Sequence, residues 1–336
     1  MNEQSDSLGL RAANLIEKSR RHAAIRARRS RLSARSAGFL FQGENPMLLS
    51  AVRRVRFRRP SLESLESRAL LSTVHLLVNT LADDPTGPVA DWTTLRDAIT
   101  AADAGSATNK YVIKFAVDGT IALSAQLPAL TGNIDIKGPG AGNLTVQGGG
   151  VSNQFSVFTT IGESNISEMT ISDGYSPGGG GGIDNYGNLS LSNLVVANCY
   201  ARFGGGGINN NGTLNVLNSI FYEDTCDDNG GAIENNEFFG VGACTIKDSF
   251  FIDNSVLGNG GAIENYGSSM TLTNSIFVGN TADSGTAGAI MNFASQGMTV
   301  SRCAFLGNSA YFDGAISSDQ SLNLASSFFL DNVDGQ

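Results

Sequence analysis

Histidine is almost missing from this chain of 336 residues. Its two histidines, His22 and His75, both precede the region that repeats, so that region cannot hold a Ser-His-Asp triad, a Cys-His pair or a histidine-bound metal. Proline occurs only seven times and glycine does not recur in strict threes, which excludes collagen. The sequence has no run of 18 apolar residues and therefore predicts no transmembrane helix. Catalytic chemistry in the repeats would have to come from carboxylates.

Charged residues are also scarce, at 16% of the chain against about 25% in typical domains. They are divided unevenly: residues 1–72 carry 15 Lys+Arg and 6 Asp+Glu (net +9), whereas residues 73–336 carry 7 and 25 (net −18). The second region repels phosphate backbones, and we predict no nucleic-acid partner for it. Residues 1–72 are predicted to be a disordered basic leader, with attachment to nucleic acid or to a membrane as the alternative for this segment.

Residues 73–150 are predicted to form an N-terminal cap and the first coils of the fold. Short strands are expected at residues 74–80, 112–117, 120–123, 134–136 and 144–146. Residues 94–102 are predicted to form a short helix, with Thr94 as its N-cap and Asp97 three residues later. The helix would cover the edge of the first coil with one apolar face, formed by Leu95, Ala98, Ile99 and Ala102.

Residues 151–336 contain an internal repeat of about 25 residues, which three apolar columns reveal together. The first column consists of Ile166, Leu191, Val216, Ile246, Leu272, Val300 and Leu324. The second follows five residues later and consists of Ile171, Val196, Phe221, Phe251, Phe277, Phe305 and Phe329. The third consists of Ile183, Ile208, Ile233, Ile263, Ile290 and Ile316. Columns that move together at this period indicate an all-β solenoid, in which each repeat is one coil and equivalent positions stack about 4.8 Å apart.

Polar positions follow the same repeat. Glycine makes up 41 of the 336 residues, about 12% against an average near 7%, and is expected at corners where a positive φ or a close backbone approach excludes a side chain. An asparagine lies two residues after five of the third-column isoleucines, at Asn185, Asn210, Asn235, Asn265 and Asn292. Strand alternation points these side chains inward, and stacked amides hydrogen-bond along the axis, so we predict an asparagine ladder.

Three segments carry a resemblance to known proteins. The repeat GGAI followed by FxxN, at residues 230–233 with 251–254 and at 260–263 with 277–280, resembles the polymorphic outer-membrane-protein repeat. Residues 95–99, 119–121 and 136–140 are similar to the capping region of bacterial right-handed parallel β-helix surface proteins. Residues 62–72 (LESLESRALLS) resemble the LExRxLLS element of exported bacterial surface proteins, in which little precedes the basic run. This last resemblance would make Met47 the true start.

The resemblance implies a right-handed parallel β-helix with a short N-terminal capping helix, at an extracellular or cell-surface location. It implies surface display with an adhesive or envelope-structural role. From the residues themselves we expect neither catalysis nor a cofactor. The partners would be polysaccharides or cell-envelope components. In departure from the outer-membrane members of the family, we expect no membrane insertion by this chain. Parallel β-helices of the pectate-lyase and polygalacturonase kind act on polysaccharides, so the alternative is a secreted polysaccharide-active enzyme, pectate-lyase-like or a glycosidase, or a glycan-binding module.

The alternative depends on the column that follows each third-column isoleucine, which should point outward. Glu234 and Glu264 occupy it on neighbouring coils, with their backbones roughly 5 Å apart, close to the carboxyl separation of a retaining glycosidase. The candidate ligand-binding residues around this pair are Asp184, Tyr186, Phe238, Phe239 and Tyr266. A lyase also needs a basic residue, and after Lys137 the sequence offers three, in different columns: Arg202, Lys247 and Arg302. Two exposed glutamates on a repeating surface are the simpler interpretation.

An acidic run and four cysteines complete the candidate sites. Asp224, Asp227 and Asp228 could hold Ca²⁺, although without EF-hand spacing a solvated loop is the simpler interpretation. Cys199 and Cys226 lie on adjacent coils, where a disulfide is geometrically feasible. The other two cysteines are two coils apart, too far for a disulfide, and are expected to pack as small residues: Cys244 and Cys303.

The last coil closes at residues 328–332, and four residues follow it. An open final coil presents unpaired backbone groups and bare apolar columns. We therefore expect either further coils beyond Gln336 or a partner that covers this edge.

Overall fold

The computed structural model describes residues 72–84, 93–236, 243–267, 269–294 and 296–335. The chain divides into two units, Met1–Leu65 and Glu66–Gln336, and all the described residues belong to the second. The predicted basic leader and the start at Met47 therefore lie outside the described residues, as do Phe238 and Phe239. No helix among the described residues is long and apolar enough to cross a membrane.

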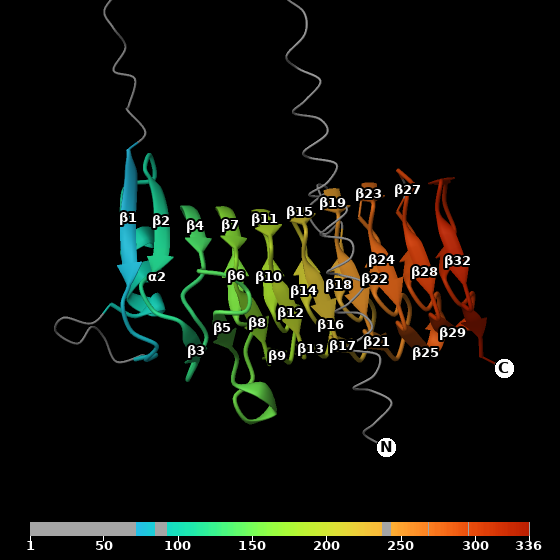
Figure 1. Cartoon of the computed structure of the whole chain (residues 1–336), viewed down its shortest axis with the longest axis horizontal. Coiled ribbons are helices and arrows are strands. Elements are labelled where there is room, and N and C mark those ends of the chain that lie inside the picture. The colour runs from blue at the N-terminus through green and yellow to red at the C-terminus, as the bar shows by residue number, and fades with distance from the viewer. Residues whose placement is uncertain (1–71, 85–92, 237–242, 268, 295, 336) are drawn as a thin grey trace, which may run out of the picture. The chain divides into compact units, whose positions relative to one another are not determined.

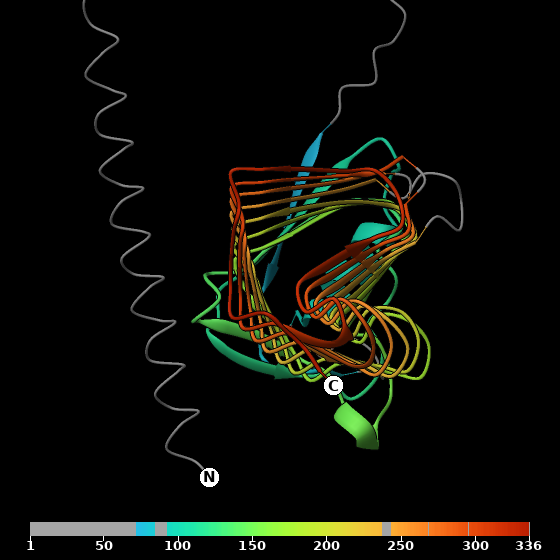
Figure 2. The same cartoon turned by 90° about the vertical axis from the view of Figure 1, so that its right-hand side faces the viewer.

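The described residues form a parallel β-solenoid, in which every ladder of paired strands is parallel and joins one coil to the next (Figure 1). A full coil contributes one strand to each of four sheets, which we number in the order in which the chain visits them. Figure 2, which looks along the stack, shows the coils superimposed. The predicted fold class, an all-β parallel β-helix with one short α-helix in its N-terminal part, is confirmed.

The strands of each sheet stack in chain order. The first sheet contains β1 (Thr73–Val78), β2 (Lys110–Phe115), β4 (Asn133–Lys137), β7 (Glu163–Ser167), β11 (Asn188–Ser192), β15 (Thr213–Leu217), β19 (Ala243–Lys247), β23 (Ser269–Thr273), β27 (Met298–Ser301) and β31 (Leu322–Ala325). The second contains β3 (Gly119–Ala122), β5 (Leu144–Gln147), β8 (Thr170–Ser172), β12 (Val195–Ala197), β16 (Ile220–Tyr222), β20 (Phe250–Ile252), β24 (Ile276–Val278), β28 (Ala304–Leu306) and β32 (Phe328–Leu330). The third contains β9 (Tyr175–Ser176), β13 (Tyr200–Ala201), β17 (Thr225–Cys226), β21 (Ser255–Val256), β25 (Thr281–Thr286), β29 (Ser309–Phe312) and β33 (Val333–Asp334). The fourth contains β6 (Phe158–Thr160), β10 (Ile183–Asn185), β14 (Ile208–Asn210), β18 (Ile233–Asn235), β22 (Ile263–Asn265), β26 (Ile290–Asn292) and β30 (Ile316–Ser318).

The three apolar columns are confirmed by the strand register. Leu272 pairs with Ile246 and Val300 in the first sheet, and the other members of that column pair in the same way. The second column forms a stack of phenylalanine rings, from Phe221 to Phe329, with neighbouring ring centroids 4.7–4.9 Å apart. The spacing of the rings is the spacing of parallel strands, so each ring packs on the next without a gap.

The predicted asparagine ladder is also confirmed, and it extends beyond the asparagines. Each Nδ2 donates to the Oδ1 of the next coil at 2.5–2.7 Å, from Asn185 to Asn292. Thr160 donates to the first amide and Ser318 accepts from the last. A second ladder was not predicted: the asparagines of the FxxN motif donate to one another at 2.8–2.9 Å, at Asn254, Asn280, Asn308 and Asn332. Its signal was in the sequence, because the motif recurs with the phenylalanine column.

The expectation that glycine fills the corners is wrong for two of the four corners of a coil. The corners on either side of the second sheet mostly hold polar residues at positive φ, among them Asn193, Asn198, Asn218, Asp248, Asp253 and Asn274. Asparagine and aspartate tolerate this left-handed conformation because their short side chains hydrogen-bond locally. Glycine recurs, as predicted, at the corner that precedes the fourth sheet, where φ is positive at Gly180, Gly204, Gly230 and Gly260. It also recurs at the corner that follows the fourth sheet, where a Cβ on Gly162, Gly187 or Gly212 would lie 2.1–2.3 Å from a backbone oxygen.

The predicted capping helix is confirmed as α2 (Leu95–Asp103), with Thr94 as its N-cap. The Thr94 hydroxyl accepts from the Asp97 backbone N–H, and the Asp97 carboxylate accepts from the Thr94 N–H, which completes a capping box. The predicted apolar face is buried in the main core: Leu95, Ala98, Ile99 and Ala102. The helix contacts β1 and β2, at the N-terminal end of the stack (Figure 1).

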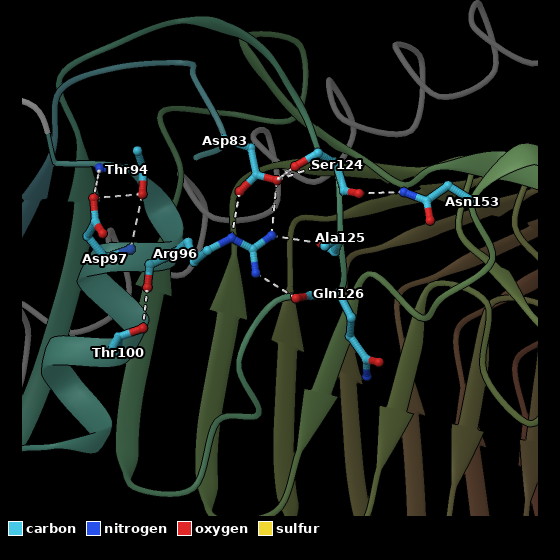
Figure 3. Close-up of polar contacts among 9 residues, drawn as sticks. All are labelled: Asp83, Thr94, Arg96, Asp97, Thr100, Ser124, Ala125, Gln126 and Asn153. Atoms are coloured by element: carbon cyan, nitrogen blue, oxygen red, sulfur yellow. Dashed lines mark hydrogen bonds and ion pairs between the residues drawn. The ribbon is translucent and has the colours of Figure 1, made fainter. Parts of the chain in front are cut away.

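Arg96 of α2, whose side chain is mostly buried, holds the helix to two neighbouring loops (Figure 3). Its guanidinium forms a bidentate ion pair with Asp83, at 2.8 and 3.0 Å, and donates to the carbonyls of Ala125 and Gln126. Burial alone would raise the pKa of Asp83, but hydrogen bonds from Arg96 and Ser124 outweigh it and lower this pKa. Arg96 therefore has a structural role: it holds the capping helix in place. The sequence motif alone did not reveal this role.

The apolar columns lose their cover in the last described coil. Phe305 is fully buried, whereas Phe329, the next ring of the same stack, is 40% exposed. The expectation that further coils or a partner cover this edge stays a prediction.

Candidate functional site

Glu234 and Glu264 occupy equivalent positions on β18 and β22, and the register pairs them directly. The sequence therefore placed the two carboxyl groups on neighbouring coils as the structure has them. The expectation that they are solvent-exposed is wrong: Glu234 is 8% exposed and Glu264 is 0% exposed. Alternation does turn them away from the axis, because the flanking Ile263 and Asn265 fill it, so another part of each coil must cover them.

The cover comes from the corner between the third and fourth sheets. Gly230 and Gly260 adopt positive φ there, 63° and 68°. A Cβ on Gly260 would lie 2.2 Å from the Ile263 carbonyl oxygen, and one on Gly230 would lie 2.4 Å from the Ile233 carbonyl oxygen. Only glycine fits such an approach. The two corner loops, residues 227–230 and 257–260, thus lie against the starts of the strands that carry the glutamates.

The electrostatics of the pair follow from this burial. Burial raises the pKa of Glu234 from 4.5 to about 7, and the nearby Asp228 adds to the rise. Burial raises the pKa of Glu264 to about 9, with further contributions from Glu234 and Asp228, while the side chain of Asn259 opposes the rise. Three of the four carboxyl oxygens, Oε2 of Glu234 and both of Glu264, are buried without a partner in hydrogen-bonding geometry. At neutral pH Glu264 is therefore protonated.

This arrangement does not suit a retaining glycosidase, which needs an ionised nucleophile and an acid that both reach the sugar. It does not suit a lyase either, because no basic side chain in the described part of the chain affects the pKa of either glutamate. Ion pairs in the described residues join Arg96 to Asp83, Lys110 to Asp135 and Lys137 to Glu168, all in the N-terminal coils. Neither glutamate's pKa is affected by the three basic residues of the later coils, Arg202, Lys247 and Arg302.

Of the candidate ligand-binding residues that the structure describes, Asp184 and Tyr186 lie together, whereas Tyr266 lies on another coil. Tyr186 donates to the Asp184 carboxylate at 3.0 Å, and burial followed by that carboxylate raises the pKa of Tyr186 to about 12. Tyr266 stacks on Phe293 with ring centroids 4.8 Å apart. Each tyrosine is 43% exposed. Tyr186 follows β10 and Tyr266 follows β22, and the strands β14 and β18 lie between these two in the fourth sheet. The face thus offers two separate aromatic patches.

A further stacked pair of aromatic rings was missed at the sequence level. Tyr175 and Tyr200, on β9 and β13, stack with ring centroids 4.3 Å apart, and the Tyr200 hydroxyl donates to Asp227 at 2.6 Å. Arg202 lies over the ring of Phe203, which is 50% exposed. The two tyrosines are 25 residues apart, so the repeat itself could have revealed them.

The three aspartates considered for Ca²⁺ do not form one exposed set. Asp224 is 0% exposed, whereas Asp227 and Asp228 lie at the surface. Asp224 takes the place of an asparagine at one end of the second ladder: its Oδ1 accepts from the Cys199 N–H, and its N–H donates to Asn254. The described residues contain no group of three or more His, Cys, Asp or Glu that could hold a metal ion.

The disulfide considered between Cys199 and Cys226 is absent, and all four cysteines are free. The register explains the difference. Cys226 pairs with Ala201 in the third sheet, whereas the Cys199 backbone bonds to Asp224. The two thiols belong to separate apolar clusters, so the chain cannot join them without moving a strand. Burial raises the pKa of Cys226 to about 12 and that of Cys199 well above its usual value, which makes both thiols poor nucleophiles.

Replacing Asp224 with asparagine is expected to stabilise the protein. Burial raises the pKa of Asp224, and its Oδ2 lacks a hydrogen-bond partner. An amide there could donate along the ladder as Asn254 does, to the next asparagine and to a backbone carbonyl. We expect Asp224→Asn to raise the free energy of unfolding by about 1–3 kcal/mol at pH 8. Urea unfolding measures the change, and Asp283→Asn, at an exposed aspartate, is the control.

No model of a known protein family matches the sequence, and no curated protein matches it. Among solved structures, a mutant of the PL6-family alginate lyase AlyGC is similar, with a TM-score of 0.46 and 13% sequence identity. The match covers 76% of this chain and 40% of the lyase chain, so this chain spans less than half of that protein's length. Similarity at this level says nothing about activity.

Proposed function

We propose that this protein is a non-catalytic β-solenoid, exported to the cell surface or beyond, with an adhesive or envelope-structural role. The observation that carries the proposal is the burial of Glu234 and Glu264. The carboxyl pair that would have to act on a sugar is closed off from solvent, and burial keeps it largely protonated. No described basic side chain shifts the pKa of either glutamate, so a lyase base is lacking there too.

The interior supports a structural role. Each coil packs on its neighbours and hydrogen-bonds to them through ring stacks, two amide ladders and continuous aliphatic columns. A solenoid of this kind is stabilised by nearest-neighbour contacts and presents an extended surface for binding. Residues 73–336 carry a net charge of −18, which suits a protein that must stay soluble outside the cell. The resemblance of residues 62–72 to an export element supports the location.

A product-release assay on the full chain tests the absence of catalysis. We expect no reducing ends and no unsaturated products from a panel of acidic and neutral polysaccharides, while the same protein binds isolated cell envelopes. Turnover that disappears in Glu234→Gln or Glu264→Gln would overturn the proposal. Protease shaving of intact cells tests the location: the native protein should be cleaved at the surface, and its protection inside the cell would contradict export.

The second candidate function is glycan binding without turnover. The stacked pair of Tyr266 and Phe293, and Tyr186 beside Asp184, offer partly exposed aromatic faces on which sugar rings can pack. A glycan array probed with the full chain distinguishes this function from a purely structural one. Binding should weaken about tenfold in Tyr266→Ala if that patch holds the sugar. An equal loss in Tyr311→Ala, at an exposed tyrosine of the third sheet, would point to non-specific binding.

A further inference from the structure

No cationic side chain in the described part of the chain neutralises the buried carboxyl pair. Glu234 and Glu264 are register partners, and three of their carboxyl oxygens are buried without hydrogen-bond partners. Two ionised carboxylates in this position would repel each other and would each lose their hydration. The pair is therefore stable only while protons neutralise it.

The groups that face the pair add negative charge or none. Asp228, in the corner loop, raises the pKa of both glutamates. The Cys226 thiol of β17 and the Tyr266 phenol after β22 are both neutral at physiological pH. Burial raises the pKa of each; Glu234 adds to the rise at Cys226, and both glutamates add to it at Tyr266. Asn236 and Asn259 contribute amides, which oppose the rise in pKa only in part. No lysine, arginine or histidine in the described part of the chain affects either pKa.

The two corner loops that cover the pair are hydrogen-bonded to each other and to neighbouring coils. The Gly230 N–H donates to the Asn259 carbonyl at 2.9 Å, and the Gly260 N–H donates to the Thr286 carbonyl at 2.9 Å. The Asn259 N–H also donates to the Asn229 side chain at 3.1 Å. The corner cluster beneath them contains only small or short apolar side chains: Ala201, Cys226, Val256, Ala282 and Ala310. Opening these loops therefore exposes little apolar surface and leaves the phenylalanine stack intact.

We propose that Glu234 and Glu264 form a proton-operated switch, in which the protonated pair lets residues 227–230 and 257–260 close over it and ionisation of the pair opens these two loops. In the open form the carboxylates are hydrated and separated from Asp228. The outer face of β18 and β22 then becomes an acidic surface beside Tyr266. The closed form presents neither charge.

The direction of the switch follows from proton binding. An exposed glutamate has a pKa of 4.5, whereas the closed form holds the pKa of Glu234 at about 7 and that of Glu264 at about 9. The closed form thus binds more protons than the open form at every pH between 4.5 and about 9. Closure is most favourable below this window and is lost as the pH rises through it. Within the window the opening equilibrium should grow by up to about tenfold per pH unit for each ionising carboxyl.

Amide hydrogen exchange on the full chain tests the switch. Exchange is measured at about pH 6, below both raised pKa values, and at about pH 10, above both, and is corrected for intrinsic exchange. We expect peptides covering residues 226–236 and 256–266 to lose at least about tenfold in protection at the higher pH. Peptides covering β11 and β15 should not change. The double variant Glu234→Gln/Glu264→Gln should keep its protection at both pH values.

Two controls make the result decisive. Glu163→Gln, at an exposed glutamate of β7, should behave as the wild type does. Equal loss of protection in the double variant and the wild type would overturn the switch. So would protection of the wild type that does not depend on pH. Addition of Ca²⁺ or Mg²⁺ at about pH 10 should leave the exchange unchanged; protection that these ions restore in the wild type but not in the variant would replace the switch with a cation site.

Discussion

Phe277→Asp is expected to abolish the folding of the C-terminal coils. Phe277 is fully buried, between the rings of Phe251 and Phe305 at 4.7 and 4.9 Å. Loss of the ring costs about 3–5 kcal/mol, and burial of an unpaired carboxylate adds to that. The sum is comparable with the total stability of a typical domain, about 5–15 kcal/mol. Because each coil contacts only its neighbours, the damage should begin at β24 and spread toward the C-terminus.

Far-UV circular dichroism and limited proteolysis measure this effect. We expect loss of part of the β signal and cleavage beyond β20, while the N-terminal coils stay protected. Phe277→Leu should retain the fold with a lowered melting temperature, since it keeps an apolar side chain in the stack. Phe203→Asp, at a phenylalanine that is 50% exposed, is the matched control and should melt as the wild type does. Wild-type melting of Phe277→Asp would contradict the inward position of the column.

Glu264→Met is expected to stabilise the protein, most strongly at alkaline pH. The register partner of Glu264 in the next coil is Met291, which is 3% exposed, so the position already accommodates methionine one coil later. The raised pKa of Glu264 means that the folded state binds more protons than the unfolded state between pH 4.5 and about 9. The wild type therefore loses stability as the pH rises through this window, and the methionine variant does not. We expect a gain of about 2–4 kcal/mol near pH 9 and little change near pH 4.5.

Thermal unfolding as a function of pH measures the gain. The difference in melting temperature between Glu264→Met and the wild type should widen steadily from acidic to alkaline pH. Glu163→Met, at an exposed glutamate, should change the free energy of unfolding by no more than about 0.5 kcal/mol at any pH. A gain that does not depend on pH would mean that improved packing, and not the removal of a buried acid, explains the stabilisation.

The alkaline behaviour also separates the proposed switch from the proposed function. Suppose that Glu264→Met is stabilised as expected but that exchange in residues 227–230 and 257–260 does not depend on pH. The buried pair then only destabilises the protein at alkaline pH and does not act as a switch. The protein could still be a non-catalytic surface protein in that case. Conversely, turnover of a polysaccharide by the full chain would remove the proposed function without deciding whether the loops open.

The sequence by itself determined the coils and their register. A period of about 25 residues in three columns predicts a stack of coils in register, because parallel strands spaced by about 4.8 Å bring equivalent positions into contact. That reasoning placed Phe277 between two other rings and Asn265 between two other amides, as the structure has them. The capping helix was equally predictable, since Thr94 and Asp97 are local signals that need no distant partner.

The tertiary structure alone decided what happens outside the axial columns. Alternation along β22 states only that Glu264 points away from Ile263; whether solvent or another segment meets it depends on how the corner loop folds back. That path is set by backbone contacts at Gly230 and Gly260, and the recurrence of glycine at this corner does not tell which side chains the loop covers. The same reason explains Asp224, which looked like part of an acidic loop but ends an amide ladder, and Cys226, which pairs with Ala201 and not with Cys199. Strand periodicity determines what fills the axis, whereas the burial of the outer face follows from loop packing that only the folded chain defines.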